Sequence, residues 1–245
     1  MTNVLSLNKE TFVQKFLTPV SKLADNISIS INENEIFTTC ASPDGSVVFL
    51  ASYKTDTAIK GIPRINLPDI KKFVRLLDCI EEDNIVVTIE NNHLKHTTPS
   101  FKFNYFLLED SYMQRCPVNP EKIKQLKYDT AFLLPVSRFN DVLKGSSIAT
   151  DSDKLYFYTK DEKVYCELND LERQNINNIT YLVADKFVGE NIKNTLPLNL
   201  ENIRLLAGSK CEEFTVKVNN DLKVTLFQIE EKNIDIKFII SALVK

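Results

Sequence analysis

The chain has 245 residues, of which 43% are hydrophobic and 26% are charged, and its formal net charge is −3. This composition supports a buried core and excludes a disordered chain, and the small charge gives no whole-molecule attraction to nucleic acid or membrane. No apolar run approaches the roughly 20 residues that span a bilayer, no secretory segment opens the chain, and the five cysteines form no CxxC pair. We therefore expect a cytoplasmic protein.

In the first half, hydrophobic periodicity predicts two helices. Residues 8–17 place four apolar side chains on one face, and Pro19 is expected to end or kink this helix. The second helix, over 69–80, has a similar apolar stripe with three cations outside it. Strands are expected at 4–7, 27–32, 35–41, 47–53, 62–67, 85–90, 94–98 and 101–108.

Residues 110–128 differ from both halves. Pro117 and Pro120 break helix and strand periodicity, and few apolar residues interrupt the polar ones. This composition predicts an extended connector, which gives two domains over 1–109 and 129–245.

The second half repeats the plan. Helices are expected over 136–144, which ends near Gly145, and over 200–207, which Gly208 would cap. The expected strands are 130–134, 155–159, 164–168, 179–184, 192–196, 214–218, 224–228 and 234–240.

The two halves also share a local pattern. The run Arg75-Leu76-Leu77 precedes an acidic turn and an alternating strand that ends at Asn91, and Arg204-Leu205-Leu206 opens the same succession about 129 positions later. A duplicated unit of helices and antiparallel strands predicts an α+β fold in which two similar domains each pack two helices on antiparallel sheets.

The residues give little sign of an enzyme. None of the five glycines falls in a phosphate-binding spacing, and His93 and His96 would point to opposite faces of a strand, which makes a poor metal pair. We expect no catalytic, cofactor or metal site. A hydrolase assembled from scattered residues around the acidic turns, such as Glu81-Glu82, stays open.

The charge is distributed unevenly. The four helical stretches carry a net charge of +5, which leaves −8 for the rest of the chain. If the helices share one side of the sheets, that side is basic and suits sequence-independent contact with phosphates.

This order of elements resembles that of the DNA sliding clamps, in particular the two-domain polymerase processivity factors of phages, archaea and eukaryotes. The resemblance spans nearly the whole chain, and its strongest parts are residues 67–91, the connector 110–128 and the ending 237–243. It implies a non-enzymatic homotrimeric ring that encircles double-stranded DNA, in the host cytoplasm if the protein is viral. The ring would tether a DNA polymerase and be opened by a clamp loader ATPase.

The resemblance also implies site residues. Strands near 101–108 and 176–183 would join neighbouring subunits. The candidates for contact with DNA are the helical cations, namely Lys9, Lys15, Lys22, Lys71, Lys72, Arg75, Arg138, Lys144, Arg204 and Lys210. A pocket for a partner's hydrophobic peptide would be lined by Ala41, Val47, Val118, Ile123, Ile239 and Ala242. The main alternative is a monomeric processivity factor of the same fold that binds DNA on one basic face.

Overall fold

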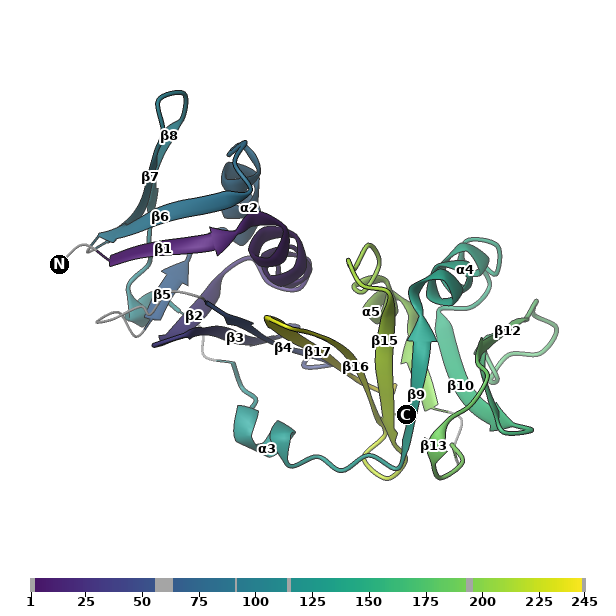
Figure 1. Cartoon of the computed structure of the whole chain (residues 1–245). Coiled ribbons are helices and arrows are strands. Elements are labelled where there is room, and N and C mark those ends of the chain that lie inside the picture. The colour runs from purple at the N-terminus through teal and green to yellow at the C-terminus, as the bar shows by residue number, and fades with distance from the viewer. Residues whose placement is uncertain (1–2, 56–63, 91, 114–115, 193–195, 244–245) are drawn as a thin grey trace. The chain divides into compact units, whose positions relative to one another are not determined.

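The computed structural model of the chain describes residues 3–55, 64–90, 92–113, 116–192 and 196–243. Contacts divide the chain into two compact units. The first comprises Met1–Ser42, Phe49–Pro120 and Glu230–Ile236, and the second comprises Pro43–Val48, Glu121–Ile229 and Lys237–Lys245. Each unit combines antiparallel strands with a few helices (Figure 1), so the predicted α+β class is confirmed. Among the described residues, none of the helices has the length and apolar character needed to cross a membrane.

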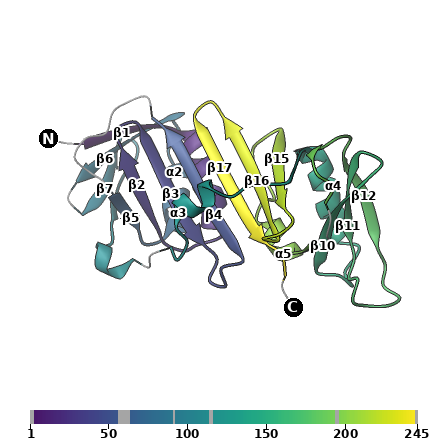
Figure 2. The same cartoon turned by 90° about the horizontal axis from the view of Figure 1, so that it is seen from below.

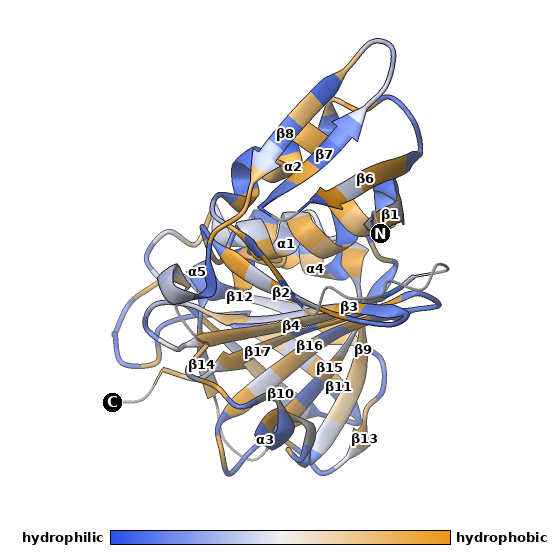
Figure 3. Ribbon diagram, turned by 90° about the vertical axis from the view of Figure 1, so that its left-hand side faces the viewer, coloured by the Kyte–Doolittle hydropathy of each residue, from blue (hydrophilic) through white to orange (hydrophobic). Residues whose placement is uncertain are grey.

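Two sets of antiparallel strands build the first unit. One sheet has the order β1-β6-β7-β8, and β4, β3, β2 and β5 lie side by side in that order (Figure 2). In β2, Ile27, Ile29 and Ile31 are buried and alternate with polar residues. Figure 3 shows hydrophobic and hydrophilic residues alternating along strands of the protein. The strands are β1 (Asn3–Asn8), β2 (Ile27–Asn32), β3 (Glu35–Ala41), β4 (Val47–Lys54), β5 (Arg64–Leu67), β6 (Asn84–Glu90), β7 (His93–Thr97) and β8 (Lys102–Phe106).

The helical stretch after β1 consists of a π-helix, η1 (Glu10–Leu17), and one α-helical turn, α1 (Thr18–Ser21). The Thr18 amide and hydroxyl both donate to the Val13 carbonyl oxygen, five residues back, which is π-helical spacing. The π-helix ends at Leu17, two residues before Pro19, in line with the expected end of this helix. The helical backbone continues as α1, because the proline lies in the first turn of α1, where its missing N–H costs no hydrogen bond. The wider turn still buries the predicted apolar residues, Phe12, Val13, Phe16 and Leu17.

Helix α2 (Ile70–Asp78) is where the sequence predicts it. The Asp69 carboxylate caps its N-terminus by accepting the Lys72 amide at 2.8 Å, and the apolar stripe is buried. Tyr105 of β8 packs on Phe73 with ring centroids 4.8 Å apart, and its hydroxyl donates to the Asp69 carbonyl oxygen at 2.7 Å. Strand β8 is therefore fastened to the start of α2.

The second unit repeats this construction with β12-β11-β10-β14 in one sheet and β13-β9-β15-β16 side by side in the other. Its helices are α4 (Val136–Ser146) and α5 (Leu200–Arg204), the latter shorter than predicted. Residues 193–195 of the predicted strand 192–196 lie outside the described residues, and β14 covers Leu196–Asn199. The other strands are β9 (Thr130–Pro135), β10 (Lys154–Lys160), β11 (Lys163–Leu168), β12 (Ile179–Ala184), β13 (Val188–Gly189), β15 (Glu213–Asn219), β16 (Val224–Glu231) and β17 (Ile234–Ser241).

Strand pairing shows that the two units are structural repeats. The first strand of each unit pairs with the strand after the unit's second helix, β1 with β6 and β9 with β15. The strand before that helix pairs with the strand after the first helix, β5 with β2 and β14 with β10. The repeat in the sequence therefore reflects a repeat in topology.

The connector is held at both ends. In the first unit, the buried Asn66 donates its side-chain amide to the Leu108 carbonyl oxygen at 3.2 Å and to Asp110 Oδ1 at 2.6 Å, and it accepts from Ser28 Oγ at 2.6 Å. In the second unit, Asn219 Nδ2 donates to the Lys127 carbonyl oxygen at 2.7 Å. Between these points lie the short helices η2 (Asp110–Tyr112) and α3 (Pro120–Lys124), so a wholly extended connector is the wrong expectation.

Candidate nucleic-acid interface

The exposed side of α2 carries three of the predicted cations. Lys71, Lys72 and Arg75 are all exposed because the buried stripe of the helix occupies the opposite face. Lys71 Nζ lies 2.9 Å from Asp25 Oδ1, and this pair is exposed on both sides. The Lys72 ammonium makes no ion pair among the described residues. The cations on this helix face can therefore donate hydrogen bonds to phosphate oxygens without any rearrangement of buried groups.

The second unit presents four more cations, three on its helices α4 and α5 and one after α5. Lys144 is 78% exposed and pairs with Asp141 at 3.2 Å, whereas Arg138 is 34% exposed and pairs with Asp185 at 2.7 Å. Arg204 pairs with Glu201 on its own helix and donates to Ser146 Oγ at 3.4 Å. The fourth cation, Lys210, follows α5 and is exposed. Exposed ion pairs are weak, so a phosphate can compete for these side chains.

Two predicted cations, Lys9 and Lys15, have a different environment. The Lys9 ammonium donates to the carbonyl oxygens of Asp78, at 2.9 Å, and Ile80, at the C-terminal end of α2, where a positive charge stabilises a helix. Lys15 is only 17% exposed and lies 2.7 Å from Glu231 Oε2. Both side chains are therefore held by the protein itself.

Lys22 follows α1 and is exposed, although the surrounding protein partly desolvates its ammonium and lowers its pKa. Lys22 therefore lies on the protein surface, as do the cations of α2, α4 and α5. Arg75 donates its Nε to the Lys71 carbonyl oxygen at 3.3 Å but stays exposed, so Lys9 and Lys15 are the predicted cations that are least exposed along the helices of the first unit.

The predicted pocket residues are divided between the two units. Ala41 and Val118 belong to the first unit, and Val47, Ile123, Ile239 and Ala242 belong to the second. Val47 is completely buried and Ile239 and Ala242 are each 5% exposed, whereas Ala41, Val118 and Ile123 are half-buried.

The start of the connector lies near the end of β3. Burial, and to a smaller extent the neighbouring Cys116 thiol, together raise the pKa of the Cys40 thiol to about 12. This electrostatic interaction shows that Cys116 of the connector lies near the strand that ends in Ala41.

The histidines do not make a metal site in the structure. His96 is buried, and its Nδ1 contacts the Val86 carbonyl oxygen at 2.8 Å, whereas His93 pairs with Glu90 at 3.1 Å. Within the described part of the chain, no three His, Cys, Asp or Glu residues are grouped so that they could hold a metal ion.

Several strands stand at the ends of sheets, and their outer edges pair with no other strand among the described residues: β1, β5 and β8 in the first unit, and β12, β13 and β14 in the second. Two of them concern the expected contact between subunits. These strands are β8 in the first unit and β12 in the second, and they fall where the sequence predicted subunit-joining strands. An exposed edge offers unpaired N–H and C=O groups to another chain.

The acidic partners of the cations were not predicted from the sequence. Asp25 pairs with Lys71 from 46 positions away, Asp185 with Arg138 from 47, and Glu231 with Lys15 from 216. No local pattern indicates such pairs, because they form only when the fold brings distant segments together.

Known proteins match this chain by structure and not by sequence. No protein-family model and no curated protein matches the sequence. Among solved structures, A. fulgidus PCNA bound to the C-terminal region of FEN-1 matches with a TM-score of 0.80 at 12% identity, over 99% of each chain. Proliferating cellular nuclear antigen from Entamoeba histolytica matches with a TM-score of 0.79 at 13% identity, also over 99% of each chain.

A bacterial protein gives a similar result. The beta chain of DNA polymerase III from Streptococcus pneumoniae matches with a TM-score of 0.76 at 12% identity, over 99% of this chain and 65% of that one. At sequence identities this low, the similarity supports a shared fold. The duplicated units, their strand order and these matches together show that the chain has the fold of the DNA sliding clamps.

Proposed function

We propose that this chain is a sliding clamp, a ring-shaped and non-enzymatic processivity factor that encircles double-stranded DNA. The observation that carries the proposal is that two of the unpaired sheet edges, β8 in one unit and β12 in the other, lie where the resemblance implies contact between subunits. Pairing β8 of one copy with β12 of the next is a head-to-tail contact, which closes into a ring when the rotation per copy fits. Three copies, with two units each, would form the ring.

The DNA contact in this proposal is electrostatic and weak. Lys71, Lys72 and Arg75 on α2 would contact phosphates, together with the exposed cations of the second unit, Arg138, Lys144, Arg204 and Lys210. A ring holds DNA by enclosure, so modest phosphate contacts are sufficient and leave the ring free to slide.

The partners in this proposal are a DNA polymerase and a clamp loader ATPase, and the site of action is the cytoplasm of a cell or of a viral host. The polymerase would dock a short apolar peptide near Ala41 and Val118 of the first unit, whose side chains are half-buried. The similar A. fulgidus structure, which contains a C-terminal region of FEN-1, supports peptide docking as a mode of partner recognition.

The first experiment measures the mass in solution by light scattering at tens of micromolar. Because one chain has a mass of 28.1 kDa, the ring predicts a species of about 84 kDa. The second experiment loads the protein on nicked circular DNA and then linearises the DNA. A topological ring slides off the linear DNA, whereas a monomer that binds on one face stays bound and is released only by salt.

A charge-reversal variant tests the DNA side. Lys71→Glu, Lys72→Glu and Arg75→Glu together should remove retention on circular DNA. The matched control reverses three exposed lysines at hairpin turns, Lys160→Glu, Lys163→Glu and Lys232→Glu, which changes the net charge equally. Equal retention of the two variants would contradict the proposed face, and a 28 kDa monomer would favour the monomeric alternative.

A further inference from the structure

The edge strand β12 is reached by an unusually long connection. Residues 169–178 contain no helix or strand, whereas the corresponding connection in the first unit, between β3 and β4, covers only 42–46. Strand β11 also shifts its register against β12 between Val164 and Tyr165. A strand that follows a long loop and an irregular register needs further contacts to fix its position.

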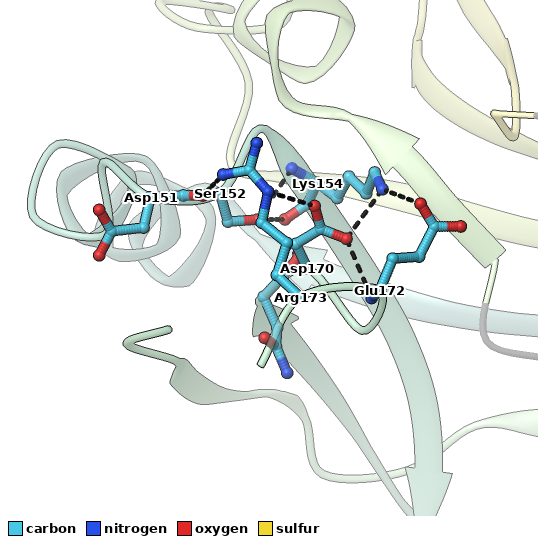
Figure 4. Close-up of polar contacts among 7 residues, drawn as sticks. Asp151, Ser152, Lys154, Asp170, Glu172 and Arg173 are labelled. Atoms are coloured by element: carbon cyan, nitrogen blue, oxygen red, sulfur yellow. Dashed lines mark hydrogen bonds and ion pairs between the residues drawn. The ribbon is translucent and has the colours of Figure 1, made fainter. Parts of the chain in front are cut away.

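Those contacts come from a group of ion pairs that we call the clip, formed by Lys154, Asp170, Glu172 and Arg173 (Figure 4). Lys154 Nζ, at the start of β10, lies 2.8 Å from Asp170 Oδ1 and 3.0 Å from Glu172 Oε2. Arg173 Nε lies 3.4 Å from the other oxygen of Asp170. Two loop residues are thus joined directly to one lysine of the sheet, and Arg173 is joined to it through Asp170.

The clip continues along the loop through further hydrogen bonds. Ser152 Oγ donates to the Asn169 carbonyl oxygen at 2.5 Å, at the point where the chain leaves β11. Arg173 Nη1 donates to the Asp151 carbonyl oxygen at 3.1 Å, and Asn177 Nδ2 donates to Asp151 Oδ2 at 3.3 Å. Asn177 lies two residues before β12, so the attachment extends from the end of one strand almost to the start of the next.

Burial makes this attachment sensitive to its charges. The side chain of Asp170 is 7% exposed and that of Lys154 is 15% exposed. The hydrogen bond with Lys154 is the main cause that lowers the pKa of Asp170, and the same bond raises the pKa of Lys154. A carboxylate buried here without its partner is destabilised, so removing either charge should release the loop.

We infer that the clip is a positioning device for β12, which holds the free edge of this strand in the register needed to pair with a second copy of the chain. The inference rests on the proposed ring, in which β12 pairs with a second copy of the chain. In that ring the clip residues would contact neither DNA nor a neighbouring subunit, and they would act only through the position of β12. Lys154 and Asp170 are positioning residues that act through the loop 169–178.

The test compares Asp170→Asn and Lys154→Met in the full chain with Asp141→Asn, which removes an exposed carboxylate of the same unit. Amide hydrogen exchange is followed by strand, and mass is followed against concentration. Asp170→Asn should speed exchange in β12 by at least about tenfold while β14 and β15 are unchanged, and should raise the concentration needed for association by a similar factor. Lys154→Met should have the same two effects. Lys154→Arg, which keeps the positive charge, should leave β12 exchange and association close to those of the wild type, and Asp141→Asn should change neither property.

The outcomes separate the inference from the proposed ring. If the wild-type chain is a monomer but β12 responds selectively to Asp170→Asn, the positioning role stands and the ring fails. If the wild-type chain associates and Asp170→Asn alters neither β12 exchange nor association, the inference is overturned and the ring stands. Faster exchange throughout the second unit would also overturn the inference, since it would show general destabilisation.

Discussion

In the first unit, the helical stretch after β1 is mainly a π-helix, in which Lys9 at its start contacts carbonyl oxygens and Lys15 within it contacts Glu231. In the second unit the equivalent element is the α-helix α4, with Lys144 exposed. Both elements bury apolar residues and occupy the same place in the strand order. The comparison teaches that topology fixes where a helix packs but leaves its hydrogen-bond pattern and the use of its cations open.

The largest expected effect tests whether both helices depend equally on one aromatic residue. Phe16 of η1 stacks on Phe12 with centroids 5.4 Å apart, and Phe139 of α4 meets Phe214 edge-on at 5.2 Å. Phe16→Ala and Phe139→Ala should each lower the free energy of unfolding by about 3–5 kcal/mol, because each leaves a cavity. Urea unfolding measures the loss, and a much smaller loss for Phe16→Ala would show that the π-helix collapses around the cavity.

The next effect compares one buried thiol in each unit. Burial raises the pKa of Cys40 from 9.0 to about 12 and also raises that of Cys166. A raised folded pKa means that the unfolded chain loses a proton that the folded chain keeps, so stability is full below about pH 9 and falls as the pH rises toward 12.

Each thiol contributes to that slope by about 1.4 kcal/mol per pH unit within its window. Cys40→Ala and Cys166→Ala should each reduce the slope of unfolding free energy against pH, measured by urea unfolding from about pH 8 to about pH 10. A slope equal to that of the wild type in both variants would show that these thiols ionise freely in the folded chain.

A smaller effect concerns the contact of α4 with β12, because a side chain at Gly145 would overlap the Tyr181 ring and hydroxyl. Gly145→Ala should destabilise the chain by about 1–3 kcal/mol through overpacking. In a Tyr181→Ala background the same change should be neutral or stabilising, since alanine favours a helix over glycine by about 0.5–1 kcal/mol. A double-mutant cycle by thermal unfolding checks this change of sign, and equal effects in both backgrounds would rule out the contact.

The smallest effect distinguishes the lysines of the two units. Lys15→Met should lower stability by about 1 kcal/mol or less, because its ion pair with Glu231 is partly exposed, and should leave the salt dependence of DNA binding unchanged. Lys144→Met should instead reduce the slope of log affinity against log salt by about 1. Fluorescence anisotropy with a short duplex at several salt concentrations measures both, and a reduced slope for Lys15→Met would return this lysine to the DNA face.

The sequence predicts elements well where the pattern is local. The apolar stripe and the Asp69 cap of α2 are visible in the consecutive residues 69–78, and the repeat around Arg75 and Arg204 predicts the duplicated topology. Local patterns do not distinguish a π-helix from an α-helix, since the apolar spacing of Phe12 to Leu17 fits both.

What the sequence does not predict depends on distant contacts or on single residues. The two-residue strand β13 requires Gly189, whose φ is 98° and where a Cβ would overlap the Asp129 carbonyl oxygen. The partner of Lys15 lies 216 positions away. The basic face could therefore be listed from the sequence, but its members could be sorted only once the fold had placed their acidic neighbours.

Asn66 gives the connector a mechanical property. Its side chain joins Leu108 and Asp110 on one side to Ser28 on the other, and Ser28 belongs to β2, which lies between β3 and β5. Asn66 itself lies in β5, the end strand of the sheet, so tension applied along the connector acts on β5 and, through Ser28, also on its neighbour β2, and it is shared by the β5–β2 and β2–β3 ladders. A load shared in this way by several backbone ladders is harder to dislodge than one borne by a chain end.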